Sequence, residues 1–285
     1  MKICAFFPTR DIGRDPVKVR DWSQAAEDLG YASIEVPDHV FGAAPRDGWS
    51  PRYSDQDPFH EVFVMLGYLA GATTTIELTT GVLILPQRQT GVVAKQAAEV
   101  DILSGGRLRL GIGVGWNPVE YQALGMEWSH RGACQAEQVD VLRQLWTQDL
   151  VTYQGKFHDL REVNITPPPV QRPIPVWFGG SSNAVIKRAA RWGDGWMPIM
   201  NPGVSAEKKL ALLRSELEYH GRDVAEFGLE GWLRVETPEP DAWASAAADW
   251  SKLGATRVLL YPMYRMTSLD EQIATLRRFK EVVAS

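Results

Sequence analysis

One stretch of the chain decides the fold: Leu103-Ser104-Gly105-Gly106-Arg107-Leu108-Arg109-Leu110-Gly111-Ile112-Gly113-Val114-Gly115-Trp116-Asn117. Gly105-Gly106 is typical of a helix end, where a positive φ is needed, and residues 108–112 fit a short strand. Gly111, Gly113 and Gly115 then remove side chains along the end of that strand. Backbone without Cβ atoms can touch a flat or anionic ligand closely.

Asn117-Pro118 supplies an N-cap residue and a proline at the first helical position, so a helix is expected to begin there. A strand whose bare end points at a helix N-terminus is a natural cofactor site. The same glycines would also serve if helices simply packed closely against the strand. The stretch alone leaves both interpretations open.

The composition is that of an ordinary globular protein, with 285 residues, 45% hydrophobic and 23% charged. The net charge of -5 gives no general attraction to nucleic acid or to anionic membranes. Cys4 and Cys134 are the two cysteines, and their wide separation argues against a disulfide framework or a cysteine zinc site. The N-terminal apolar run is too short for a signal peptide, and no stretch approaches the length of a membrane span, so a cytoplasmic protein is expected.

Eight apolar strands alternate with helices along the chain. The predicted strands cover residues 3–7, 33–36, 76–85, 108–112, 176–178, 195–197, 229–235 and 257–260. The predicted helices cover residues 17–29, 58–72, 92–103, 117–124, 135–146, 183–191, 206–220, 240–253 and 269–283. This alternation predicts parallel strands with crossover helices, closed into a (β/α)₈ TIM barrel that forms one domain over residues 1–285. An open, doubly wound sheet is the alternative. Residues 45–57 are expected to form a loop, and residues 152–171 an insertion between barrel units.

In such a barrel, chemistry takes place at the carboxyl ends of the strands. His39 follows the second strand, where it could give or take a proton, although Asp38-His39 could also be a plain turn. Gly179-Gly180-Ser181-Ser182 precedes a helix, so it suits a phosphate or, equally, an ordinary turn with an N-cap serine. Trp116 and Trp177 lie near strand ends and are the better pocket candidates among the tryptophans.

Several other kinds of site are disfavoured. A dinucleotide fingerprint fails because residue 116 is Trp and the glycines follow the fourth strand rather than the first. Neither a GxSxG elbow nor an HExxH motif occurs, and no cluster of metal ligands is apparent, so no metal is predicted.

A set of short segments, in this order, carries a family resemblance. They are Val36-Pro37-Asp38-His39-Val40, Thr80-Gly81-Val82-Leu83-Ile84-Leu85-Pro86, Leu103-Ser104-Gly105-Gly106-Arg107, Gly111 to Trp116, and Trp177-Phe178-Gly179-Gly180-Ser181. Together they resemble the luciferase-like monooxygenase superfamily of flavin and deazaflavin enzymes. The chain looks most like the short F420-dependent oxidoreductases, which are TIM barrels.

The resemblance implies a set of site residues. His39 would be catalytic, and the cofactor F420 would lie against Asp38, His39, Gly81, Val82, Leu83, Gly113, Val114, Gly115, Trp116, Gly179, Gly180 and Ser181. Family members hold a non-proline cis peptide in the third strand, which corresponds to Gly81-Val82. The fourth-strand exit would contact the ring, and Gly179-Gly180-Ser181 the phosphate. Some F420-dependent dehydrogenases carry a catalytic glutamate at the fourth-strand exit, but this chain does not. Glu120 is near but is expected inside the following helix, so no role is assigned to it.

The resemblance implies an oxidoreductase that moves a hydride between F420 and a small organic substrate. An FMN-dependent monooxygenase, which uses reduced flavin, O₂ and a separate reductase, is the first alternative. A non-catalytic barrel that binds a flavin or another ligand is the second. A homodimer is expected from the family, and the substrate would be selected by residues 41–56 and 152–171, where loops vary most.

Overall fold

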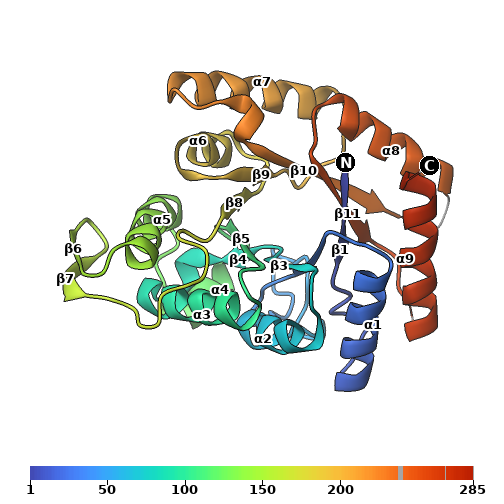
Figure 1. Cartoon of the computed structure of the whole chain (residues 1–285), viewed down its shortest axis with the longest axis horizontal. Coiled ribbons are helices and arrows are strands. Elements are labelled where there is room, and N and C mark those ends of the chain that lie inside the picture. Colours follow the sequence, from blue (N-terminus) through green and yellow to red (C-terminus); the bar gives the residue numbers. More distant parts are fainter. Residues whose placement is uncertain (237–239, 267, 285) are drawn as a thin grey trace.

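The protein is a barrel of parallel strands surrounded by helices, as the computed structural model in Figure 1 shows for residues 1–236, 240–266 and 268–284. The barrel strands are, in chain order, β1 (Lys2–Phe6), β2 (Ser33–Val36), β3 (Glu77–Thr80) with β4 (Leu83–Ile84), β5 (Leu108–Gly113), β8 (Val176–Gly179), β9 (Gly195–Met197), β10 (Gly228–Val235) and β11 (Arg257–Pro262). β3 and β4 together form the third strand of the barrel, so the predicted set of eight strands is confirmed.

The barrel closes because β1 pairs in parallel with both β2 and β11, while β3 and β4 both pair with β5. The remaining neighbours follow the order β5, β8, β9, β10, β11, and all of these pairs are parallel. Closure confirms the TIM barrel and excludes the open, doubly wound sheet.

Helices lie outside the strands (Figure 1). They are α1 (Pro16–Asp28), α2 (Val62–Ala72), α3 (Thr90–Leu103), α4 (Pro118–Ala123), α5 (Arg131–Thr147), α6 (Asn183–Trp192), α7 (Val204–Tyr219), α8 (Pro240–Lys252) and α9 (Leu269–Ala284), with short 3₁₀ turns η1 (Leu85–Gln87) and η2 (Val224–Glu226). Their buried faces include Trp22 and Trp146, which are core residues. None of the helices in the described ranges is both long and apolar enough to cross a membrane.

Several boundaries differ from the sequence prediction by one to four residues, and two of the differences lie near the candidate site. α2 begins at Val62 rather than at residue 58, because the Glu61 side chain accepts a hydrogen bond from the Val64 amide and so caps the helix there. The third strand is split, and the peptide bond between Gly81 and Val82 at the split is cis, as the resemblance implied. The predicted insertion contains an antiparallel hairpin of β6 (Val151–Gln154) and β7 (Asp159–Val163), which projects from the barrel in Figure 1.

Arg107, at the start of β5, joins two neighbouring units of the barrel. Its Nη1 donates to the Ile76 carbonyl at 2.7 Å, and its Nη2 donates to the carbonyls of Ala70 and Thr73 at 3.0 Å each. Its Nε donates to the Ser104 carbonyl at 2.7 Å. One guanidinium therefore satisfies carbonyls at the end of α2, before β3 and after α3, which fixes the turn that the Gly105-Gly106 pair makes.

We expect Arg107→Lys to lower the free energy of unfolding by about 2–4 kcal/mol, because an ammonium cannot donate in four directions in one plane and leaves buried carbonyls unpaired. Urea unfolding followed by circular dichroism measures this change. Arg20→Lys is the control, since Arg20 pairs with Asp21 on the exposed face of α1 and should change stability by less than about 0.5 kcal/mol. Equal effects of the two substitutions would contradict the assignment.

Candidate functional site

The floor of the candidate site is built around Val82, at the split in the third strand. A Cβ atom added to Gly113 would lie 2.7 Å from Val82 Cγ2, and one added to Gly179 would lie 2.6 Å from Val82 Cγ1. Val82 therefore rests on two bare strand ends, those of β5 and β8, and remains partly exposed. Gly113 and Gly179 serve the site by making room for this side chain.

Asp38 anchors the segment after β2 from one side. Its Oδ2 accepts from the Ile84 amide at 2.9 Å, and its Oδ1 lies 2.7 Å from Arg88 Nη2. Burial raises the pKa of the Asp38 carboxyl, and the Arg88 guanidinium and the Ile84 amide offset part of that rise. Both carboxylate oxygens are used within the protein, so Asp38 holds the backbone before His39.

Glu120 holds the same segment from the other side. His39 Nδ1 lies 3.0 Å from Glu120 Oε2, and Glu120 Oε1 accepts from the amides of Val40 at 2.6 Å and Phe41 at 3.1 Å. The Glu120 side chain is fully buried and that of His39 is 9% exposed. Burial opposes ionisation, but the bonds from His39 and the two amides outweigh it, so the pKa of Glu120 lies below its ordinary value.

Aromatic rings surround the His39 imidazole. The ring centroids of Phe59, Tyr53 and Trp116 lie 4.8, 5.5 and 5.6 Å from that of His39. The Trp49 ring stacks on Trp116 at 6.3 Å with an interplanar angle of 24°. Residues 41–60, which include the loop predicted over residues 45–57, therefore lie over the end of the barrel and enclose His39 in an aromatic wall.

A pair of hydroxyl groups fastens this loop to the barrel. Tyr53 and Tyr261 hydroxyls are 2.7 Å apart, and Tyr261 stands at the carboxyl end of β11. The Tyr261 ring in turn packs against Phe6 at 4.5 Å and Trp232 at 5.1 Å, inside the barrel. The loop and three strands thus share one aromatic layer, which closes the site from below.

The β8 exit has fewer free donors than the sequence suggested. The Gly180 amide donates to the Met197 carbonyl at 3.1 Å, and the Gly180 carbonyl accepts from Trp196 Nε1 at 2.7 Å. The Ser182 side chain caps α6 by accepting from the Val185 amide. No backbone hydrogen bond from the Ser181 amide is found among the described residues.

The structure gathers most of the predicted residues but not all. His39, Val82, Gly179 and the β5 exit with Trp116 meet at one end of the barrel. Leu83 is fully buried in the pairing with β5, so its side chain does not face the site. Trp177, taken from the sequence as a pocket residue, is only 7% exposed. It lies deeper in the barrel with Arg109 over its ring at 4.4 Å.

The sequence interpretation missed Glu120, Tyr53 and Tyr261. Glu120 is the third residue after the N-cap Asn117, a position from which a glutamate points back beyond its own helix. That spacing was visible in the sequence, but the tertiary partner was not. The two tyrosines lie 208 residues apart, and nothing local to either one indicates the contact.

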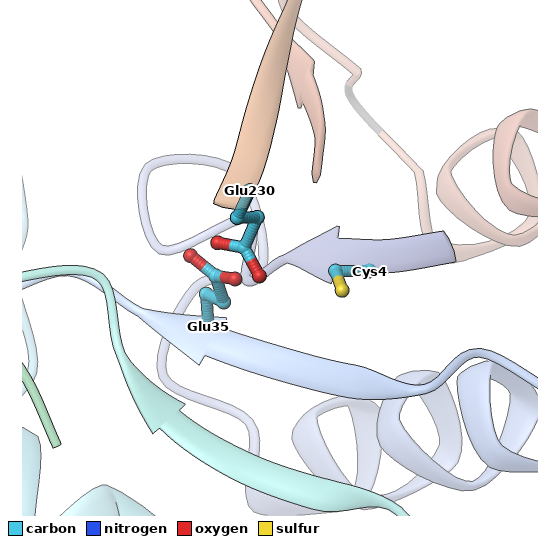
Figure 2. A group of neighbouring side chains, drawn as sticks. All are labelled: Cys4, Glu35 and Glu230. Carbon is cyan, nitrogen blue, oxygen red and sulfur yellow. The ribbon is translucent and has the colours of Figure 1, made fainter. Parts of the chain in front are cut away.

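One group of side chains could in principle hold a metal ion. Ligand atoms of Cys4, Glu35 and Glu230 lie within 4.8 Å of one another inside the barrel, in the part of the chain that the structure describes (Figure 2). Arg109 Nη2, however, lies 2.7 Å from Glu230 and 3.3 Å from Glu35 and already supplies positive charge there. We therefore assign no metal to this group.

Comparison with known families gives a match over nearly the whole chain. The sequence profile of the family described as luciferase-like monooxygenase matches residues 1–280. An uncharacterised protein of Mycobacterium tuberculosis is 36% identical over 182 residues, which make up 61% of this chain and 62% of that protein. The chain thus matches less than two thirds of that relative's length. An F420-dependent glucose-6-phosphate dehydrogenase of Kineococcus radiotolerans is 32% identical over 248 residues, 85% of this chain and 70% of that enzyme.

Solved structures share the fold at lower identity. The monooxygenase RslO1 of Streptomyces bottropensis superposes with a TM-score of 0.82 at 21% identity, covering 100% of this chain and 99% of that one. The F420-dependent tetrahydromethanopterin reductase of Methanopyrus kandleri superposes with a TM-score of 0.81 at 14% identity, covering 99% and 98%. At these identities the likeness concerns the barrel fold.

We expect Glu120→Gln to lower the free energy of unfolding at pH 7 by about 1–3 kcal/mol, because an amide cannot offer His39 and the two backbone amides an anion. The pKa of Glu120 is lowered in the folded state, so this stability is present above the ordinary glutamate pKa of about 4.3 and is lost as pH falls below it. The gap between wild type and variant should therefore narrow in acid, as urea unfolding across a pH series would measure.

Glu99→Gln serves as the control for this prediction, because Glu99 is half exposed on α3 and makes only a 3.8 Å contact with Lys95. Its stability should stay within about 0.5 kcal/mol of wild type at every pH. If the difference in the free energy of unfolding between wild type and Glu120→Gln stays constant as pH falls, Glu120 is not ionised in the folded protein.

Proposed function

The chain belongs to the luciferase-like monooxygenase family, and we propose that it is an F420-dependent oxidoreductase that transfers a hydride between the deazaflavin and a small organic substrate. The His39–Glu120 pair is the observation that carries this proposal. A carbonyl or similar group that accepts a hydride must also receive a proton, and the aromatic wall places one proton-handling side chain at the site. The similarity to an F420-dependent dehydrogenase over 85% of the chain supports the choice of cofactor.

The residues at the carboxyl end of the barrel suit a flat tricyclic ring. Val82 presents a small apolar surface that no neighbouring Cβ crowds, since it lies on Gly113 and Gly179. Trp116 stands at the rim, and the Ser181 amide and the α6 N-terminus suit the anionic end of such a cofactor. The deazaflavin would supply the hydride chemistry at its C5 atom, and the protein would supply position and electrostatics.

His39 is the residue that would move the proton. Ionised Glu120 can only accept a hydrogen bond, so Nδ1 of His39 carries the hydrogen in their contact. That leaves Nε2 to hold or take up a proton on the side of the ring away from Glu120. Asp38 and Glu120 clamp the backbone on both sides of His39, which limits the positions that Nε2 can adopt.

The substrate of the Kineococcus relative is not carried over to this chain. The fourth-strand exit reads Val114-Gly115-Trp116-Asn117 and has no glutamate where some F420-dependent dehydrogenases place a catalytic one. Trp116 occupies that exit instead, and Glu120 brings a carboxylate to His39 from α4. We therefore propose a small organic substrate with an apolar or aromatic part that fits against Trp116 and Tyr53.

The FMN-dependent monooxygenase is the second candidate, because the family that the chain matches is described as luciferase-like monooxygenase. Titration of the purified protein with F420 and with FMN, each followed by cofactor fluorescence, separates the two. We expect saturable F420 binding and at least tenfold weaker FMN binding, which corresponds to about 1.4 kcal/mol. Tight FMN binding without F420 binding would favour the monooxygenase, and binding of neither would overturn both.

We expect His39→Gln to reduce hydride transfer by about 10²–10⁴-fold, because glutamine can form a hydrogen bond to a substrate but cannot deliver a proton. F420 affinity should change by no more than about threefold, since the lost interaction belongs to the transition state. Single-turnover absorbance of the deazaflavin measures the rate, and the fluorescence titration measures the affinity. An unchanged rate would remove His39 from the mechanism.

We expect Gly179→Ala to weaken cofactor binding by about tenfold, because the new Cβ would lie 2.6 Å from Val82 Cγ1 and would push that side chain into the site. Gly71→Ala is the matched control. Gly71 lies in α2 with no heavy atom within 4 Å of the added Cβ, so its cofactor affinity should equal that of wild type. Equal affinities of the two variants would show that Val82 does not contact the cofactor.

A further inference from the structure

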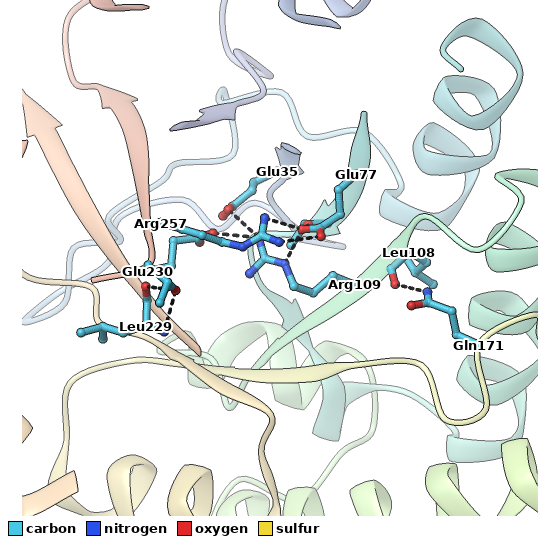
Figure 3. Close-up of polar contacts among 10 residues, drawn as sticks. Glu35, Glu77, Leu108, Arg109, Gln171, Leu229, Glu230 and Arg257 are labelled. Carbon is cyan, nitrogen blue, oxygen red and sulfur yellow. Dashed lines mark hydrogen bonds and ion pairs between the residues drawn. The ribbon is translucent and has the colours of Figure 1, made fainter. Parts of the chain in front are cut away.

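Beneath the candidate site, the barrel interior holds a cluster of five charged side chains (Figure 3). Arg109 on β5 lies 2.7 Å from Glu230 on β10, 3.3 Å from Glu35 on β2 and 2.6 Å from Glu77 on β3. Arg257 on β11 donates two hydrogen bonds of 2.8 Å to Glu77. Arg109, Glu35 and Glu230 are all buried.

The charges in this cluster do not balance if every group is ionised. Three carboxylates face two guanidinium groups, which leaves one negative charge in excess. Glu77 is 26% exposed at the edge of the cluster, whereas the side chains of Glu35 and Glu230 are fully buried. Among the described residues, the adjoining strands add no further cation: β1 contributes Cys4, whose pKa is raised by burial, and β8 contributes the neutral ring of Trp177. An uncompensated charge in such a place is costly, and a carboxyl group avoids the cost by holding a proton.

The geometry shows where that proton belongs. The carboxyl groups of Glu35 and Glu230 point toward each other in Figure 2, with the Cys4 thiol beside them. Glu35 Oε2 and Glu230 Oε1 are fully buried, and no hydrogen-bond partner reaches either one within the described residues. One proton between the facing groups turns an acceptor into a donor and satisfies an oxygen on each side.

Of the two carboxyl groups, that of Glu35 is the one more easily protonated. Glu230 has the closer contact with Arg109, at 2.7 Å against 3.3 Å for Glu35. Burial and the neighbouring charge of Glu230 raise the pKa of Glu35. Burial is the largest single influence on Glu230 and raises its pKa, but the charges of Arg109 and Arg257 and the contact with the Glu35 carboxyl together outweigh it, so the pKa of Glu230 lies below its ordinary value.

Glu35 also touches the floor of the site from below. A Cβ added to Gly81 would lie 3.0 Å from both Glu35 Cβ and Glu35 Oε2. Gly81 therefore lies directly on the Glu35 side chain, and the next residue is Val82, which faces the site. A change in the charge or position of the Glu35 side chain would therefore act on the Gly81-Val82 segment, against which a bound ring would lie.

We propose that Glu35 holds a proton that it shares with Glu230, and that as a neutral acid it is a positioning residue that supports the Gly81-Val82 segment from inside the barrel. The first half concerns the protein alone. The second half rests on the proposed function, because it assigns that segment to a cofactor.

Infrared difference spectroscopy of the cofactor-free protein tests the shared proton. Wild type should show the carbonyl stretch of a protonated carboxylic acid at neutral pH, and Glu35→Gln should lack it. Glu120→Gln is the matched control, since it removes a buried glutamate that is ionised, and it should keep the band. Absence of the band in wild type, or its persistence in Glu35→Gln, would overturn the proposal.

Two further variants test the charge count. Glu77→Gln removes one of the three carboxylates, so the remaining two balance Arg109 and Arg257 and the band should disappear at lower pH than in wild type. Glu230→Gln removes the carboxylate that repels ionised Glu35, so in this variant too the band should disappear at lower pH than in wild type. A stoichiometric metal ion that is bound by wild type and lost in Glu35→Gln would contradict the shared proton.

Stability against pH gives a second, independent measurement on the cofactor-free protein. Glu35→Gln should fold, because its amide is neutral and can donate to Glu230 in place of the acid. Between the ordinary glutamate pKa and the raised value in the folded state, the native protein binds one proton more than the unfolded chain. As pH rises through this range, the folding equilibrium constant of wild type should therefore fall tenfold per pH unit relative to that of Glu35→Gln. Parallel curves of stability against pH for the two proteins would overturn the assignment.

The positioning half is tested by cofactor affinity across the same pH range. With wild type, affinity for an anionic cofactor should fall where the infrared band disappears, and with Glu35→Gln it should stay level there. Level affinity in both proteins would overturn the positioning role while the infrared result stands. Failure of F420 and FMN to bind at any pH would instead overturn the proposed function, and with it this half, but not the shared proton.

Discussion

A guanidinium inside a closed barrel has to be neutralised by the barrel's own strands, and Arg109 imposes this constraint here. It is buried, and its partners come from β2, β3 and β10, which are separated from it by 74, 32 and 121 residues in sequence. Without carboxylate partners, the Arg109 guanidinium would be a buried and uncompensated charge, which costs more than an ion pair contributes. The cluster therefore forms only when these strands are brought together in the closed barrel, and it favours one strand order and register.

The same register places the site. Glu35 precedes His39 by four residues, and Arg109 precedes Gly113 by four, so β2 and β5 each bring a charge into the interior and lead to a site residue at the barrel's end. Between these two levels lies the aromatic layer of Phe6, Trp232 and Tyr261. The layer does not shield Glu35, which lies directly beneath Gly81. The loop over residues 41–60 is fastened to this layer through Tyr53. The position of His39 is thus determined from below by the barrel and from above by Glu120.

The strands and helices were predictable because their signals are local: apolar runs, proline and glycine boundaries, and the Asn117-Pro118 cap. The strand-end rule also placed His39 and Trp116 correctly at one end of the barrel. It misplaced Trp177, which enters the interior from the first half of β8 rather than from its end. The charged interior had a readable signal, since Glu35, Arg109 and Glu230 each stand between apolar neighbours in a strand. Which carboxylate meets Arg109, and which meets His39, depends on tertiary contacts that no local pattern encodes.

The glycines of the β5 exit have a different purpose from the one that bare backbone first suggests. If Gly113 merely exposed peptide to a ligand, the space beside it would be open, but Val82 fills that space, and Gly179 on β8 meets the same side chain. Two glycines from two strands therefore support one valine from a third. A valine surface is apolar and flat enough for a ring, whereas exposed peptide groups would offer it dipoles and attract water. The floor of the candidate site is thus the Val82 side chain, whose position depends on Gly113 and Gly179. A Cβ added to either glycine would displace Val82 toward a bound ring.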